Sequence, residues 1–249
     1  MTAAEVHKEL LEDPKKMFIC QGGKHDGCFR VKYEHLDPDG GIIGLIPGSF
    51  NPIHKAHLWL YRKVIEDSYR SSRILYEMSI TRVDKDPVSV AELETRLAQF
   101  TEQQRVLITN APRMIHKIAV VNELMEGSVR MRFFVGMDTI LRMAQDYSLF
   151  GIGGLHADFV LVNRNVAGTL VRADTFCSEK DCPKNVFPFY FQPPEELSKI
   201  SSSAIRKELE DKQKELSQEA VKEAWKKVRE DSLGWAPKRR RQAPKTQRD

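Results

Sequence analysis

The sequence predicts an α/β fold of the Rossmann-like, doubly wound type, with a mainly parallel sheet and helices on both faces. Short apolar runs of strand length alternate with amphipathic segments of helix length from residue 41 onward. This alternation is typical of parallel strands joined by helices. The 249 residues, 41% apolar and 30% charged, suffice for one sizeable domain with a packed core.

The elements follow from local patterns. The first predicted strand, Gly41–Leu45, is a short apolar run that stops at Pro47-Gly48, as expected of a fully buried strand. A helix is predicted over Val90–Gln103, because Ser89 is suited to cap it and Glu92 completes a capping box. The remaining predicted strands are Ile74–Ile80, Val106–Thr109, Val129–Val135, Phe159–Val162 and Val186–Phe191, and the remaining helices are His57–Tyr69, Met114–Met125, Thr139–Gln145, Ser203–Lys214 and Gln218–Asp231.

The chain divides into three regions. We expect an N-terminal extension over residues 1–40, a main domain over 41–232 and a basic, disordered tail over 233–249. Within the extension, Phe18–Tyr33 is compatible with an extra hairpin, and the sequence leaves open whether this hairpin packs on the core.

Charge excludes one class of function for the body of the chain. Lys238 to the end holds six basic residues and one acid, so 33 basic and 34 acidic residues remain elsewhere. The body therefore lacks the positive charge of a domain that binds nucleic acid. The tail PKRRRQAPKTQR is either a nuclear-import tag, an arm that contacts phosphates, or a merely solvated segment.

The sequence also argues against membrane insertion and secretion. The most apolar stretch, Gly40–Phe50, is far shorter than the roughly 20 residues that span a bilayer. The N-terminus mixes acids with bases and has no apolar segment of the kind found in signal peptides. We therefore expect a cytoplasmic protein, or a nuclear one if the tail directs import.

The four cysteines predict a reduced compartment rather than a disulfide scaffold. Neither pair, Cys20 with Cys28 or Cys177 with Cys182, has the C-x₂-C spacing of common zinc modules. His25 between the first two keeps a zinc site open, with buried or idle thiols as the favoured interpretation.

A first anion-binding pattern follows the first strand. The segment Gly48-Ser49-Phe50-Asn51-Pro52-Ile53-His54-Lys55-Ala56-His57 leads into a helix. Gly48 allows the backbone to approach a ligand, and a helix start presents unpaired N–H groups to an anion. His54 and His57 lie three residues apart, so their imidazoles share one face and can donate hydrogen bonds to phosphate oxygens.

A second pattern of this kind opens a helix near the other end of the domain. Ser201, Ser202 and Ser203 supply capping hydroxyls, and Arg206 follows one turn later, within reach of the same anion. Two such helix starts in one α/β chain favour a cleft for a triphosphate.

Together these segments resemble the HxGH and ISSTxxR signatures of the nucleotidylyltransferase superfamily. Gly136-Met137-Asp138-Thr139-Ile140 is similar to the GxDxL segment of nicotinamide mononucleotide adenylyltransferases, and Arg164 resembles the basic residue after that family's late strand. Lys85 and Arg96 resemble its lysine before, and its arginine within, the second helix. The resemblance covers about residues 41–210 and is closest to eukaryotic members. Two positions depart from the signatures: Ala56 replaces the glycine of HxGH, and Ser203 replaces the threonine of ISST.

The resemblance implies transfer of an adenylyl group from ATP to nicotinamide mononucleotide or a related mononucleotide, with pyrophosphate as the other product. His54 and His57 would contact the α- and β-phosphates, Ser202, Ser203 and Arg206 would hold the β- and γ-phosphates, and Ser201 would also bind the nucleotide. Backbone at Gly48, Ser49 and Phe50 would pack on the nucleoside. Near Gly136 and Arg164, Asp138 would accept a hydrogen bond from a ribose hydroxyl.

The partners implied are ATP, a small phosphorylated acceptor, and Mg²⁺ carried by the triphosphate, with no metal held by the protein alone. The alternatives are a cytidylyltransferase or other nucleotidylyltransferase acting on a different phosphate, and a non-catalytic nucleotide sensor. The sequence leaves the acceptor and the oligomeric state open, a homo-oligomer included.

Overall fold

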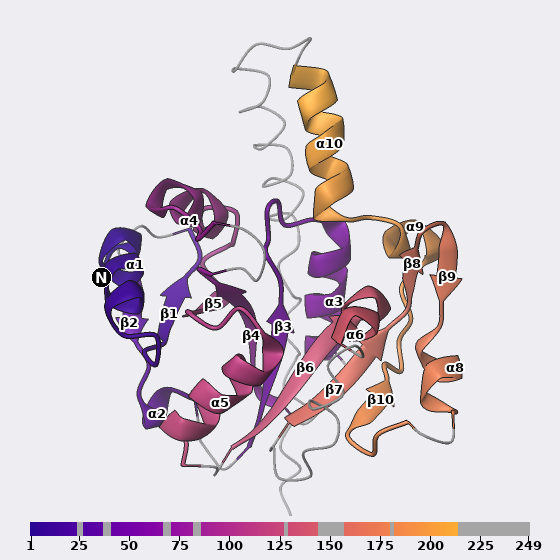
Figure 1. Ribbon diagram of the computed structural model, residues 1–249, viewed down its shortest axis with the longest axis horizontal. Coiled ribbons are helices and arrows are strands. Elements are labelled where there is room, and N and C mark those ends of the chain that lie inside the picture. The colour runs from indigo at the N-terminus through magenta and orange to yellow at the C-terminus, as the bar shows by residue number, and fades with distance from the viewer. Residues whose placement is uncertain are drawn as a thin grey trace, which may run out of the picture.

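The computed structural model describes residues 1–23, 27–36, 41–66, 71–81, 86–126, 129–143, 157–179 and 182–213. An eight-stranded sheet runs through them, with helices packed on it (Figure 1). Its parallel strands are β3 (Ile42–Pro47), β4 (Ser71–Ser79), β5 (Arg105–Thr109), β6 (Arg130–Gly136), β7 (Ala157–Val162) and β10 (Val186–Pro188). They lie in the order β10-β7-β6-β3-β4-β5, so the winding of the chain reverses between β3 and β6.

Burial explains why these apolar runs form strands. All six residues of β7 are buried, as are the four central residues of β3. Continuous burial is expected of parallel strands that are covered on both faces. The six strands predicted from residue 41 onward all form, and the α/β prediction is confirmed.

The helices cover both faces of the sheet. One core cluster lies against α1 (Ala3–Glu12), α3 (Lys55–Glu66) and α4 (Val90–Leu97). The other lies against α2 (Tyr33–Leu36), α5 (Met114–Leu124), α6 (Met137–Met143) and α8 (Ala173–Cys177). Neighbouring strand residues belong to opposite clusters, Leu45 to the second and Ile46 to the first, because successive side chains on a strand point to opposite faces.

The helix that follows β4 begins where the sequence predicts and ends earlier. Both bonds of the capping box form, since Ser89 Oγ accepts from the Glu92 N–H and Glu92 Oε2 from the Ser89 N–H. The helix stops at Leu97 rather than at residue 103. Beyond this point, backbone hydrogen bonds reach back three residues instead of the four of an α-helix. The Gln99 N–H donates to Arg96 O and the Phe100 N–H donates to Leu97 O.

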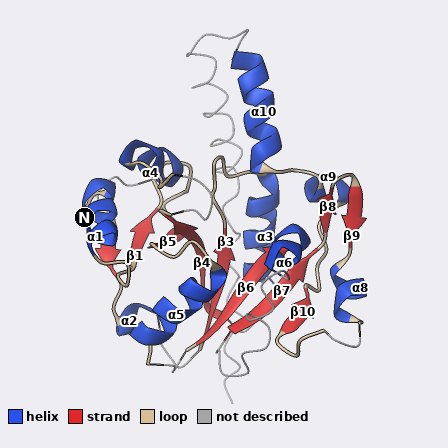
Figure 2. Cartoon of the chain, viewed as in Figure 1, coloured by secondary structure: helices blue, strands red, loops and turns tan. Residues whose placement is uncertain are grey.

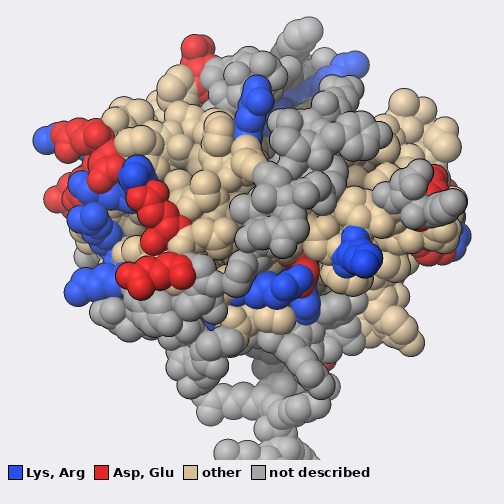
Figure 3. Space-filling view, turned by 60° about the horizontal axis from the view of Figure 1, so that its bottom comes forward, with Lys and Arg blue, Asp and Glu red and all other residues tan. Residues whose placement is uncertain are grey.

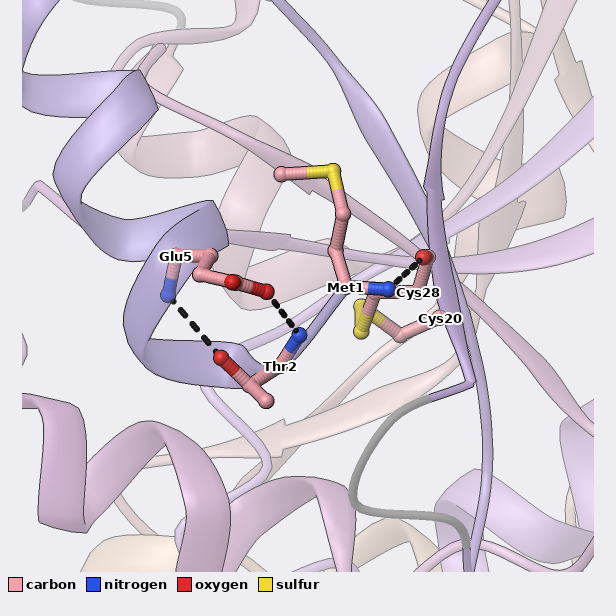
Figure 4. Close-up of a disulfide and its surroundings, with 5 residues drawn as sticks. All are labelled: Met1, Thr2, Glu5, Cys20 and Cys28. Carbon is pink, nitrogen blue, oxygen red and sulfur yellow. Dashed lines mark hydrogen bonds between the residues drawn. A yellow bond between two sulfur atoms is a disulfide. The ribbon is translucent and has the colours of Figure 1, made fainter.

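The N-terminal segment is part of the sheet. β1 (Phe18–Gln21) pairs antiparallel with β5 and with β2 (Cys28–Arg30), so the hairpin does pack on the core. Cys20 and Cys28 are buried directly opposite each other on this hairpin and form a disulfide (Figure 4). The expectation of thiols is therefore wrong for this pair. That expectation rested on sequence spacing alone, whereas the antiparallel register of the hairpin brings two residues eight positions apart into contact.

The other two cysteines, Cys177 and Cys182, are free thiols and form no disulfide. His25 lies outside the described residues, and within those described no cluster of three or more His, Cys, Asp or Glu side chains is placed to hold a metal.

After β7, β8 (Arg164–Val166) and β9 (Thr169–Val171) form a separate antiparallel pair. The last described elements, after β10, are α9 (Glu195–Ser198) and α10 (Ser202–Gln213), and α10 projects away from the sheet (Figure 2). The predicted helix Gln218–Asp231 and the basic tail lie outside the described residues. Of the helices described, none is both long and apolar enough to cross a membrane.

Figure 3 shows acidic and basic side chains interspersed on the side that carries the N-terminal elements.

Candidate active site

A cavity of about 300 Å³ opens at the carboxyl ends of β3 and β6, where the winding of the sheet reverses. Ligands of open α/β sheets bind at this position. Segments far apart in the sequence form its wall: the loop after β3, the start of α3, the ends of β6 and β7, and the start of α10.

The loop after β3 follows an unusual path around Phe50. Phe50 has a φ of 45°, which is uncommon for a residue with a side chain, and its ring is fully buried. The ring lies beneath Gly48, where an added Cβ would come within 2.7 Å of it. A glycine at position 48 is therefore required for this loop, and the strained turn places the Gly48 and Ser49 backbone on the cavity wall.

Helix α4 and the turn that follows it hold this loop from behind. The buried Arg96 guanidinium donates to the backbone oxygen of Ser49 over 3.2 Å and pairs with Glu92. The side chain of Gln99 bonds to backbone atoms of both Phe50 and Ile53. Arg96 is thus a support of the loop, and it does not line the cavity.

The two histidines stack at the start of α3. Their ring centroids are 3.7 Å apart at an interplanar angle of 20°. The backbone N–H of His54 donates to Nδ1 of His57 over 3.3 Å, so a neutral His57 carries its proton on Nε2. Nδ1 of His54 is buried and has no hydrogen-bond partner among the described residues.

Both histidines are neutral at pH 7. Burial, followed by the positive charge of Arg164, lowers the pKa of His54 from 6.5 to about 4. Burial, with the neighbouring His54 and Arg164, lowers the pKa of His57 well below 6.5. The pair therefore presents neutral N–H donors to the cavity.

The start of α10 is fastened to the loop after β3. Ser202 Oγ donates to the backbone oxygen of Pro52 over 2.9 Å, and Ser201 Oγ caps the helix by accepting from the Ala204 N–H. Arg206 donates to the backbone oxygen of Asn51 and to Ser203 Oγ. The two anion-binding patterns of the sequence, about 150 residues apart, thus lie against each other.

The ends of β6 and β7 close the opposite wall. Arg164 Nε lies 3.7 Å from Oδ1 of Asp138, and burial is greater for the arginine than for the carboxylate. A Cβ added to Gly136 would come within 2.5 Å of the same Asp138 oxygen. A glycine at 136 therefore leaves room for Asp138 to turn toward Arg164.

Most of the site residues predicted from sequence line this one cavity. These residues are Gly48, Ser49, His54, His57, Gly136, Asp138, Arg164, Ser201, Ser202 and Ser203. Phe50 lies buried beneath the wall, and Arg206 reaches the loop without lining the cavity. Lys85 lies outside the described residues.

Other lining residues were not assigned to the site from the sequence. Trp59 lines the cavity and packs edge-on to Phe189. Thr139, Asn163 and Ser198 also line it. Thr139 and Asn163 each lie next to a predicted site residue, and this adjacency is the only sequence signal for them.

Comparison with known proteins identifies the family and supports the fold. The profile of the cytidylyltransferase-like family matches residues 45–208. Among curated protein sequences, no match was found. The solved structures that match include the Plasmodium falciparum nicotinic acid mononucleotide adenylyltransferase complexed with NaAD, at 18% identity over 67% of this chain and 82% of that one, with a TM-score of 0.50. A structure of that adenylyltransferase complexed with APC matches at 17% identity over 67% and 83%, with a TM-score of 0.47. At these identities the structural likeness supports the fold alone.

Proposed function

The chain belongs to the cytidylyltransferase-like family, a family of nucleotidylyltransferases, and from this premise we propose that it transfers an adenylyl group from ATP to nicotinamide mononucleotide or a related mononucleotide. The products would be a dinucleotide such as NAD and pyrophosphate.

One observation carries the proposal: two neutral histidine donors and the serine-rich start of α10 meet at a single cavity. The wall also offers the Arg164 cation and the start of α3. Hydrogen-bond donors and helix starts bind phosphates. Such a wall is suited to a chain of phosphates.

The chemistry needs no covalent nucleophile from the protein. An acceptor phosphate oxygen attacks the α-phosphorus of ATP, the bond from that phosphorus to the bridging oxygen breaks, and pyrophosphate leaves with the bonding electrons. Catalysis then consists of positioning and of stabilising charge on the transferring phosphoryl group. We assign the α- and β-phosphates to His54 and His57, and the β- and γ-phosphates to Ser202, Ser203 and Arg206.

The wall is compatible with a Mg²⁺ that arrives on the triphosphate. Asp138 is the one carboxylate among the described lining residues, and the other side-chain oxygens belong to serines, Thr139 and Asn163. Mg²⁺ usually keeps several waters and is bound through substrate phosphates and one or two carboxylates. When bound, it would neutralise phosphate charge, and the carboxylate on this wall that would bind its waters is Asp138.

The choice of acceptor rests on the GxDxL-like segment and on Arg164 at the far wall. The adenylyltransferase of similar fold acts on nicotinic acid mononucleotide, so both mononucleotides belong in the test. Ala56 lines the cavity where the family signature has glycine, and this favours the sensor as the second candidate.

Pyrophosphate release tests the proposal directly. The purified protein is supplied with ATP or CTP and Mg²⁺, together with nicotinamide mononucleotide, nicotinic acid mononucleotide or a phosphorylated alcohol. We expect release with ATP and a mononucleotide. Release with CTP and the phosphorylated alcohol, and none with ATP, would make the chain a cytidylyltransferase. Binding of ATP without release for any acceptor would indicate a sensor.

A further inference from the structure

The side chain of Gln99 connects two points of the strained loop that carries the histidines. Its Oε1 accepts from the backbone N–H of Ile53 over 2.8 Å, and its Nε2 donates to the backbone oxygen of Phe50 over 3.2 Å. Nε2 also donates to the backbone oxygen of Thr95 on α4, over 3.3 Å. Gln99 follows the end of α4, and because both ends of its amide are engaged, its orientation is determined.

Both loop contacts lie next to the histidines. Ile53 immediately precedes His54. Phe50, held in a positive φ, packs its ring edge against His57 at a centroid distance of 5.0 Å. A shift of the loop at either contact would therefore move one of the donors that face the cavity.

We propose that Gln99 is a positioning residue for the reaction: through Phe50 and Ile53 it sets the place of the His57 and His54 rings relative to the phosphates. The inference rests on the proposed function. Gln99 itself does not line the cavity, so it acts through the loop. The role requires one donor and one acceptor on the same group, which an amide has and a carboxylate lacks.

The chain offers a matched control in Gln104, which follows α4. This buried amide also bonds to a backbone, since its Oε1 accepts from the Thr101 N–H over 2.8 Å. Its Nε2 donates to the Tyr76 hydroxyl, and within the described residues its side chain has no hydrogen bond to the loop after β3. Gln104→Leu therefore disturbs a comparable amide that reaches the histidine loop only indirectly, through Tyr76, whose ring packs against Phe50 at a centroid distance of 5.2 Å.

The test compares Gln99→Leu, Gln99→Glu and Gln104→Leu with wild type in steady-state pyrophosphate release at about pH 8, where a carboxylate is ionised. Gln99→Glu keeps the size of the side chain and the acceptor for Ile53, but directs an oxygen at the Phe50 carbonyl. We expect both Gln99 variants to lower kcat by about 10- to 100-fold, because small displacements of positioned groups have effects of this size. KM for the acceptor should stay within about threefold of wild type, and so should kcat of Gln104→Leu.

Thermal denaturation of the same proteins separates positioning from loss of fold. A folded Gln99→Glu protein with wild-type kcat would overturn the inference. So would a Gln104→Leu protein whose kcat falls as far as that of the Gln99 variants at the same loss of stability. If Gln99→Leu does not fold, the isosteric Glu variant still decides.

Calorimetric titration with ATP separates failure of the inference from failure of the proposed function. If wild type binds ATP without releasing pyrophosphate, the proposed activity is wrong, and weaker ATP binding by both Gln99 variants than by Gln104→Leu still supports the positioning role. Unchanged ATP binding by the Gln99 variants in that case overturns it. A wild-type protein that neither binds ATP nor turns over would overturn both.

Discussion

Replacing His57 with alanine removes one neutral donor from the cavity and leaves the helix that carries it intact. Nδ1 of His57 accepts from the His54 N–H, so Nε2 is the nitrogen with a proton to donate. In the proposed reaction this proton meets charge that grows on the transferring phosphoryl group. Loss of one such donor costs about 10²–10³ in kcat, or about 3–4 kcal/mol.

The structural cost of the same substitution is smaller. His57 gives up one backbone hydrogen bond and its ring contacts with Phe50 and His54. A single hydrogen bond contributes about 1 kcal/mol to stability, less than the expected effect on the barrier. Alanine is also well suited to the interior of α3. Activity should therefore fall much further than the free energy of unfolding.

The assay is steady-state pyrophosphate release with ATP and a mononucleotide, together with urea denaturation of each protein. His116→Ala is the matched control, because this exposed histidine on α5 does not line the cavity. It should keep wild-type kcat. If folded His57→Ala turns over within about threefold of wild type, the assignment of this cavity as catalytic is wrong.

Three further predictions concern Arg206, a buried ion pair and His54. Arg206→Ala should raise KM for ATP and lower kcat together, since its charge would meet phosphates already charged in the ground state; steady-state kinetics that show a change in kcat alone would contradict this. Lys117→Met should lower the free energy of unfolding in urea by about 3–5 kcal/mol, because it leaves the buried Glu77 carboxylate without its 2.6 Å partner. Lys15→Met, which breaks an exposed pair of similar length, is the control, and equal losses would refute the role of burial. The pKa of His54 is about 4 in the folded protein and 6.5 unfolded, so its contribution to stability is present above pH 6.5 and is lost as the pH falls toward 4. The full loss in the free energy of unfolding is about 3 kcal/mol. Urea denaturation above pH 6.5 and near pH 4 measures it, and between these conditions His54→Asn should lose less stability than wild type by about that amount. Equal losses in the two proteins would contradict the depressed pKa.

Local patterns predicted the parallel sheet because its strands are buried along their whole length. An apolar run such as Val106–Thr109 needs no information from distant residues to be recognised as such a strand. The capping box at Ser89 is equally local. Helix α1 carries the same signal, with Thr2 followed by Glu5, and it would have predicted that helix.

Long-range pairing could not be predicted in this way. β1 joins the sheet by pairing with β5, more than 80 residues later, and no local pattern specifies that partner. The disulfide follows from the register of this hairpin, which sequence spacing does not reveal.

For the site, the motifs indicated which residues meet but not how each is held. The HxxH and serine-rich segments predicted the cavity wall, whereas the positive φ of Phe50 and the bonds of Gln99 depend on how α4 packs against the loop. Arg206 illustrates the limit best. Its spacing after the serines predicts a phosphate ligand, and in the structure its guanidinium bonds to the Asn51 carbonyl.

The charges of the cavity indicate how it would respond to a phosphate chain. Arg164 is the one arginine or lysine among the described lining residues, and it lies against Asp138 while its field lowers the pKa of both histidines. A phosphate bound beside it would compete with Asp138 for the guanidinium and would cancel part of that field. Because an anion stabilises a protonated imidazole, the same phosphate would raise the pKa of His54 and His57. This electrostatic response to the triphosphate requires no movement of the fold.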